Sequence, residues 1–223
     1  TWFSENFDNL RDKLFAGIPT DIVEKKSDYE TIGEKLNTQS LPLVNITVEK
    51  DNVSGDSYTN AAMEINDPLK RTGGNQIAKF NCKVKYHGQK SLKYDKKSFT
   101  VKLLNDNGKS LDTNIMNIRK DDTWILDAMQ TDPSRLRNRI NSDIWNSFSF
   151  TPYDNGNNQR NGTRGYMVEV FINGDYHGLY CLTDKVNRKL LGLKKAKKGD
   201  DGNPTINGVM YKADGAGPQT RLS

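Results

Sequence analysis

Hydrophobic and polar residues alternate along much of the chain between residues 41 and 212. A period of two residues is typical of a strand with one buried face. Between the later segments, Asn173-Gly174 is a strong signal for a tight hairpin turn. The pattern therefore predicts a sheet of mainly antiparallel neighbours, with strands at residues 41–48, 61–65, 80–86, 99–104, 124–129, 166–172, 178–182 and 208–212.

Two other segments have the apolar spacing of helices. The first lies within residues 1–38, which we expect to form an N-terminal helical or extended segment ahead of a main domain at residues 39–223. The second covers residues 135–148 and follows a helix-start signal at Thr131-Asp132-Pro133-Ser134. We expect this helix to pack on the sheet, because apolar residues recur at every fourth position: Leu136, Ile140, Ile144 and Phe148. The predicted fold class is therefore α+β, a mainly antiparallel sheet with packed helices.

Composition and charge indicate which partners and which location are expected for the chain. The net charge of +5 is mild, and the densest basic run, Lys194 to Lys198, lacks the interleaved aromatic residues of a single-strand nucleic-acid site. We therefore expect no nucleic-acid partner. No run approaches the roughly 20 apolar residues of a transmembrane helix, and we recognise no signal peptide. The abundance of Asn, Asp, Thr and Gly favours a secreted or cell-surface protein.

Several common site chemistries lack their motifs. Cys82 and Cys181 have neither a CxxC spacing nor a nearby histidine pair, so no metal site is predicted. Both cysteines occupy inward strand positions, where they are either buried free thiols or a disulfide. Neither GxxxxGK[ST] nor GxGxxG occurs. The two histidines, His87 and His177, have no recognisable triad partner.

A basic turn separates the predicted strands at residues 80–86 and 99–104. Such a turn can wrap the phosphates of a nucleotide. It can equally be a solvated hairpin tip whose lysines keep a strand edge from pairing with another chain. Both interpretations stay open from these residues alone: His87, Gly88, Lys90, Ser91, Lys93, Lys96 and Lys97.

Three motifs in one order resemble the CotH family, the spore-coat-protein-H-like proteins that are similar to atypical protein kinases. The first is HGQKS at residues 87–91 with KKSF at 96–99. The second is WIL at 124–126 with DPSRLRN at 132–138, and the third is VEVFING at 168–174 with GLYCLTDK at 178–185. The resemblance covers residues 41–185. His87, Lys90 and Asp184 depart from it, because the family usually has Arg, Ser and Glu there.

The resemblance implies a domain like the amino-terminal lobe of a kinase, which would transfer phosphate from ATP to a protein substrate with Mg²⁺. In such a lobe a strand lysine holds phosphates, and Lys97 is the first choice for this role, with Lys102 as the alternative. Asp184 would begin the linker that contacts adenine. The implied nucleotide-binding residues are His87, Ser91, Lys96, Lys97, Arg137, Asn138 and Asp184.

The resemblance also leaves part of the site outside this chain. The metal-binding acidic residues of the family lie further downstream, so neither a catalytic residue nor a metal ligand is assigned, and we expect the domain to be incomplete at its C-terminal end. The alternative function is a non-catalytic cell-surface or structural module with a kinase-like fold. The protein substrate and the oligomeric state are not indicated by the sequence.

Overall fold

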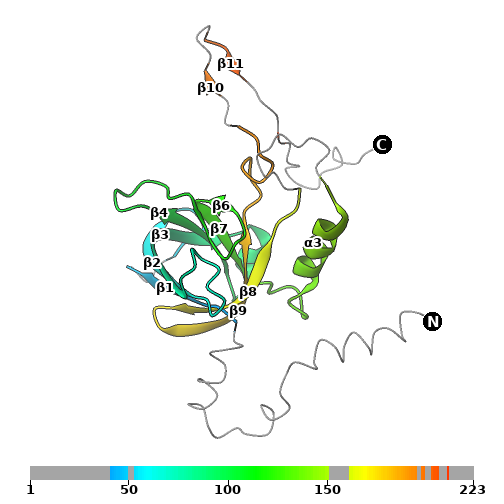
Figure 1. Cartoon of the computed structure of the whole chain (residues 1–223). Helices are drawn as coiled ribbons and strands as arrows, with labels where there is room; N and C mark the ends of the chain where they lie inside the picture. Colours follow the sequence, from blue (N-terminus) through cyan, green and yellow to red (C-terminus); the bar gives the residue numbers. More distant parts are fainter. Residues whose placement is uncertain are drawn as a thin grey trace, which may run out of the picture. The chain divides into compact units, whose positions relative to one another are not determined.

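A computed structural model describes residues 41–49, 53–150, 161–194, 197–198, 202–205 and 210. Seven strands close into a barrel in the order β1-β2-β3-β4-β7-β9-β8 (Figure 1). Neighbouring strands are antiparallel except for β1 and β8, which are parallel and close the barrel. The barrel strands are β1 (Leu43–Val48), β2 (Thr59–Asn66), β3 (Ile77–His87), β4 (Ser98–Leu104), β7 (Thr123–Asp127), β8 (Gly165–Ile172) and β9 (Asp175–Asp184).

The other described elements are short. A single 3₁₀ turn, η2 (Lys90–Lys93), lies between β3 and β4, and one α-helix, α3 (Arg137–Phe148), lies between β7 and β8. Two small sheets complete the described part of the chain. They pair β5 (Thr113–Asn114) with β6 (Lys120–Asp121), and β10 (Lys197–Lys198) with β11 (Pro204–Thr205).

The core fills the inside of the barrel, because alternate side chains of every strand point inward. Most of the predicted strands are confirmed, and Asn173-Gly174 forms the predicted turn between β8 and β9, with φ of 51° and 90°. The largest completely buried side chains are Trp124 and Tyr180. Cys82 and Cys181 are both buried and free, so the disulfide alternative is wrong.

The predicted α+β class with packed helices is also wrong. The described residues are mostly strands in a closed barrel, with α3 as their one α-helix. The predicted apolar stripe of this helix exists but is exposed, with Ile140 at 48% and Phe148 at 64% relative exposure. The side of α3 that contacts the rest of the domain is polar, since the buried Arg139 donates a hydrogen bond to the Thr163 carbonyl at 2.7 Å. The barrel completes its own core without the helix.

The helix also begins two residues later than predicted, because Arg135 adopts a φ of 59° outside the helical range. Among the described helices none combines the length and the apolar character needed to cross a membrane. The predicted helix in residues 1–38 lies outside the described residues, as does nearly all of the strand at 208–212. The domain boundary near residue 38 stays a prediction.

Candidate functional site

The turn between β3 and β4 is held by its own side chains. The ammonium of Lys97 donates to the backbone carbonyl of Leu92 at 2.7 Å and to that of Tyr94. Gly88 has a φ of +108°, and a Cβ at this position would lie 2.0 Å from Oγ of Ser91. Lys97 therefore holds the turn and Ser91 lies against Gly88, and the proposed contact of both residues with a nucleotide stays a prediction.

His87 and Lys96 lie at the same end of the barrel as this turn. His87 places Nδ1 3.0 Å from Oγ1 of Thr100. The ammonium of Lys96 donates to the Leu179 carbonyl at 2.5 Å and lies 4.3 Å from the centroid of the Tyr180 ring. Burial and the nearby charge of Arg135 lower the pKa of Lys96. Lys96 is therefore a half-buried cation bound to the middle of β9.

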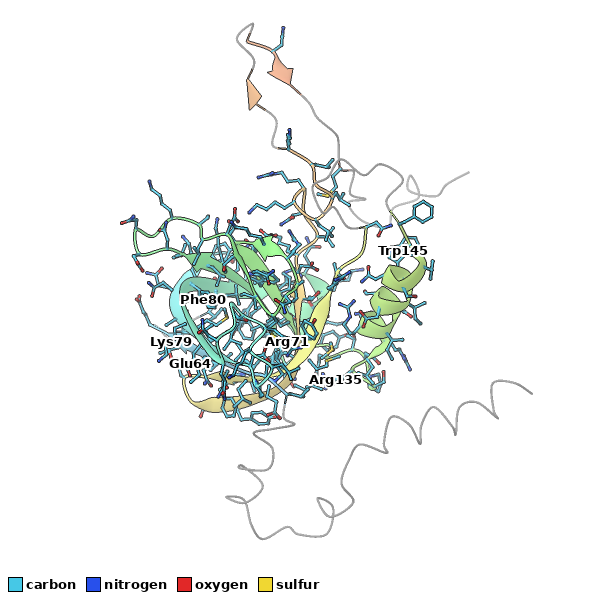
Figure 2. The ribbon with its side chains drawn as sticks, viewed as in Figure 1. Glu64, Arg71, Lys79, Phe80, Arg135 and Trp145 are labelled. Atoms are coloured by element: carbon cyan, nitrogen blue, oxygen red, sulfur yellow. The ribbon has the colours of Figure 1, made fainter. Side chains whose placement is uncertain are left out.

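The two predicted residues on α3 lie on its exposed surface. Arg137 is 73% exposed, and its Nε is 3.6 Å from Oδ1 of Asp132. Asn138 lines a cavity of about 210 Å³ between α3 and strands β7 and β9, together with Arg139 and Cys181. Figure 2 labels Arg135 in the segment that leads into this helix. The structure thus brings Asn138 to a cavity and leaves Arg137 in solvent.

Asp184, the last predicted residue, belongs to a buried ion-pair network. It ends β9 with 2% exposure, and its Oδ2 lies 3.2 Å from Nε of Arg119. Arg119 also pairs with Asp121 at 2.5 Å and donates to the Lys185 carbonyl at 2.9 Å. Asp184 additionally accepts the backbone N–H of Arg164 at 3.0 Å. These contacts fix the segment that follows β9.

An acidic cluster adjoins this network. Asp112, Asp121 and Asp122 place one carboxylate oxygen each within 4.8 Å of the others. The ammonium of Lys189 already contacts all three carboxylates, at 3.1 Å from Asp121 and 3.5 Å from Asp122. Burial alone would lower the pKa of Lys189, but its hydrogen bonds to Asp112 and Asp121 raise it. Because Lys189 supplies the positive charge, this cluster does not fit a divalent metal.

Three lysines gather on the outer face of the β3–β4 hairpin. Lys83 and Lys102 are directly opposed in the strand register, and Lys85 is opposed to Thr100. Their neighbours Cys82, Val84, Val101 and Leu103 point into the core, so these three lysines point outward. We call Lys83, Lys85 and Lys102 the lysine face.

The lysine face has little compensating charge. Directly opposed side chains have Cβ atoms about 4.5–5.5 Å apart, where like charges destabilise a sheet. Lys102 has one distant carboxylate partner, Oδ2 of Asp122 at 3.9 Å. Lys85 lies 5.3 Å from the centroid of the Tyr58 ring, and Lys83 has no ion pair within the described residues. This arrangement can bind an anion that carries several charges.

From the sequence, Lys102 is predicted only as the alternative phosphate lysine, and Lys83 and Lys85 are not predicted as site residues. The local signal was present, because each lysine alternates with buried residues of its strand. The opposition of Lys83 and Lys102 depends on the length and shape of the intervening turn, which alternation does not encode.

A family model described as CotH kinase protein matches residues 84–223, more than half of the chain. This region begins within β3 and includes Lys85, Lys102 and the motifs from which the resemblance was drawn. Strands β1 and β2 precede it. A search of curated proteins finds no match.

Proposed function

Because the chain belongs to the CotH kinase protein family, we propose that its barrel binds the phosphates of ATP in a phosphotransferase that acts on a protein substrate. The lysine face carries this proposal. Lys83 and Lys102 are like charges in direct opposition, and a polyphosphate between them replaces repulsion with charge-assisted hydrogen bonds. Lys85 adds a third donor on the same face of the hairpin.

The residues around the lysine face suit a bound phosphate chain. Tyr58 packs against Lys85 and Asp122 lies near Lys102, so two of the three ammonium groups have neighbours that limit their motion. Bound ATP would supply the transferable phosphoryl group, and Mg²⁺ would neutralise its charge. The acidic cluster with Lys189 does not fit Mg²⁺, so we assign the metal no ligand among the described residues.

Titration of the chain with ATP and with inorganic tripolyphosphate tests the proposal. We expect Lys83→Met to weaken the binding of both at least tenfold, about 1.4 kcal/mol. Lys79→Met is the matched control, because Lys79 lies on the same strand and the same face but pairs with Glu64 at 3.0 Å. Equal losses in the two variants, or no loss in either, would contradict the assignment.

A non-catalytic module is the second candidate. Lys97 and Asp184, which lie in the family-like motifs, both use their charges inside the fold. These internal contacts favour a domain that has the fold of the family but does not catalyse phosphate transfer. The secreted or cell-surface location predicted from composition suits such a module and is part of this second proposal. Absence of ATP binding at about 1 mM and of phosphate transfer with Mg²⁺ would favour it.

A further inference from the structure

A cavity of about 680 Å³ lies on the outer face of β1, β2 and β3. The segment after β4 forms one wall, with Asn105, Asp106 and Leu111. The volume is within the range of about 300–1,000 Å³ that is typical of small-molecule sites. On β3 the cavity reaches Asn81 and stops before Lys83 of the lysine face. We call this cavity the amide groove.

The strand register explains why the surface is hollow here. Thr47, Ala62 and Asn81 are opposed across the three strands and form one row of outward side chains. Asn45, Glu64 and Lys79 form the next row. Ala62 is the smallest side chain in either row and occupies the middle strand, so the longer side chains around it become walls. Figure 2 shows Glu64, Lys79 and Phe80 close together on this side of the barrel.

The polar side chains that line the amide groove carry little net charge, and they alternate with an apolar lining of Met63, Phe80, Leu104 and Leu111. Glu64 and Lys79 neutralise each other at 3.0 Å. The side chains of Asn45, Thr47 and Asn81 have no hydrogen-bond partner in the described part of the chain. Each amide offers two donors and an acceptor, and a hydroxyl offers one donor and two acceptor sites. Unused groups of both kinds, side by side, match a ligand that is itself rich in hydroxyl groups.

We propose that the amide groove binds a neutral polyhydroxylated ligand of the carbohydrate class. An anion would gain little, because the one lysine of the groove is already paired. The free carboxylate of Asp106 at the rim accepts hydrogen bonds from hydroxyl groups. This site goes beyond the proposed phosphotransferase activity. Its residues on β1, β2 and β3 precede residue 84, where the family match begins.

The side-chain amide signals of Asn45 and Asn81 report binding directly. We would record them by NMR on the ¹⁵N-labelled full chain while adding cellobiose, maltose or diacetylchitobiose to about 10 mM, a range suited to weak binding. We expect at least one of these sugars to shift both signals in a saturable manner. Ala62→Trp should fill the hollow and reduce the affinity at least tenfold. Ala62 is exposed, so this change adds no bulk to the core.

Asn60→Trp is the matched control, because Asn60 is an exposed residue on the same face of β2 but does not line the groove. It should bind the sugar as the parent chain does. If Ala62→Trp does not fold, Asn81→Ala replaces it with the same expected loss. The proposal is overturned if no sugar shifts the two amides, if Ala62→Trp binds undiminished, or if a neutral blocked peptide shifts them while the sugars do not. Lys83→Met should leave sugar binding unchanged, which separates this site from the proposed ATP site.

Discussion

Replacement of Arg119, which lies between β5 and β6, by Met should be among the most destabilising single changes in the domain. The Arg119 side chain is only 10% exposed, and the side chains of its partners Asp121 and Asp184 are completely buried. Met fills a similar volume but removes the positive charge. Asp121 retains Lys189 at 3.1 Å and the amide of Asn187 at 2.9 Å. Asp184 retains the backbone N–H of Arg164 but loses the ion pair with Arg119.

The expected magnitude follows from this unequal loss. Removing one partner of a buried ion pair costs about 3–5 kcal/mol, because the other charge stays buried without compensation. The stability of a whole domain is only about 5–15 kcal/mol. One guanidinium nitrogen of Arg119, Nη1, is buried without a hydrogen-bond partner in the described residues, so the wild-type network itself is not fully satisfied. We therefore expect the lower half of that range.

Urea unfolding followed by tryptophan fluorescence measures the change. The double variant Arg119→Met, Asp184→Asn should recover part of the loss, because an amide oxygen still accepts the Arg164 N–H and position 184 no longer carries a buried charge. Arg137→Ala is the control, because Arg137 is exposed and its ion pair with Asp132 is long, and it should change stability by less than about 0.5 kcal/mol. A loss below about 1 kcal/mol for Arg119→Met, or no recovery in the double variant, would refute the reasoning.

Three further changes test the packing. Ile140→Asp should alter the free energy of unfolding by less than about 0.5 kcal/mol, because Ile140 is 48% exposed, whereas Val84→Asp should prevent cooperative folding, as thermal melting of both will show. Gly88→Ala should lose about 1–3 kcal/mol in urea unfolding, from its positive φ and from the contact with Ser91. Burial raises the pKa of the Cys82 thiol to about 12 from 9.0, so the fold keeps it neutral while the unfolded chain ionises it near pH 9. Stability should therefore fall as the pH rises from about 9 towards 12, and a smaller fall in Cys82→Ala, measured as unfolding free energy against pH, would identify this thiol as a cause.

The strands could be predicted from the sequence because hydrophobic and polar residues alternate as buried and exposed side chains do along a strand. The predicted segment at residues 80–86 lies within β3, and the segment at 99–104 lies within β4. Closure of the barrel was not predictable, because it depends on the parallel pairing of β1 with β8, in which Leu43 is opposed to Glu169. No local pattern records a contact over such a sequence distance. The closed barrel was therefore missed because this pairing was not predicted, although the strands themselves were.

The helix shows a different limit of prediction from the sequence, which concerns the face by which a helix packs. Its four-residue apolar spacing correctly grouped the side chains of one face, but spacing does not say whether the barrel covers that face. The buried Arg139 satisfies the polar side of α3, with Asp143 at 2.7 Å and the Thr163 carbonyl at the same distance. The helix therefore contacts the rest of the domain through an arginine, a residue type that is usually exposed. Burial of an arginine requires partners, and Thr163 is 24 residues away in the sequence.

The candidate site shows the same difference between features that a local sequence motif predicts and features that depend on how strands pair. A motif at residues 87–97 identified a real structural unit, the turn that Lys97 holds, but its cations Lys96 and Lys97 bind backbone carbonyls around them. The opposed cations Lys83 and Lys102 lie on the two strands that enter and leave this turn. A turn that fixes the hairpin also fixes the opposition of Lys83 with Lys102. A motif can thus determine binding through the register it imposes, without contacting the ligand.

Strand β3 then carries two surface chemistries on one face. From Lys79 to Asn81 its outward side chains are neutralised or uncharged, and from Lys83 to Lys85 they are cationic without close carboxylates. Because outward residues of a strand follow each other about 6.6 Å apart, a ligand on one half lies beside a ligand on the other. Lys83→Met and Ala62→Trp change one half each. If each variant loses only its own ligand, the two sites are independent, and loss of both ligands in either variant would show that they form one continuous site.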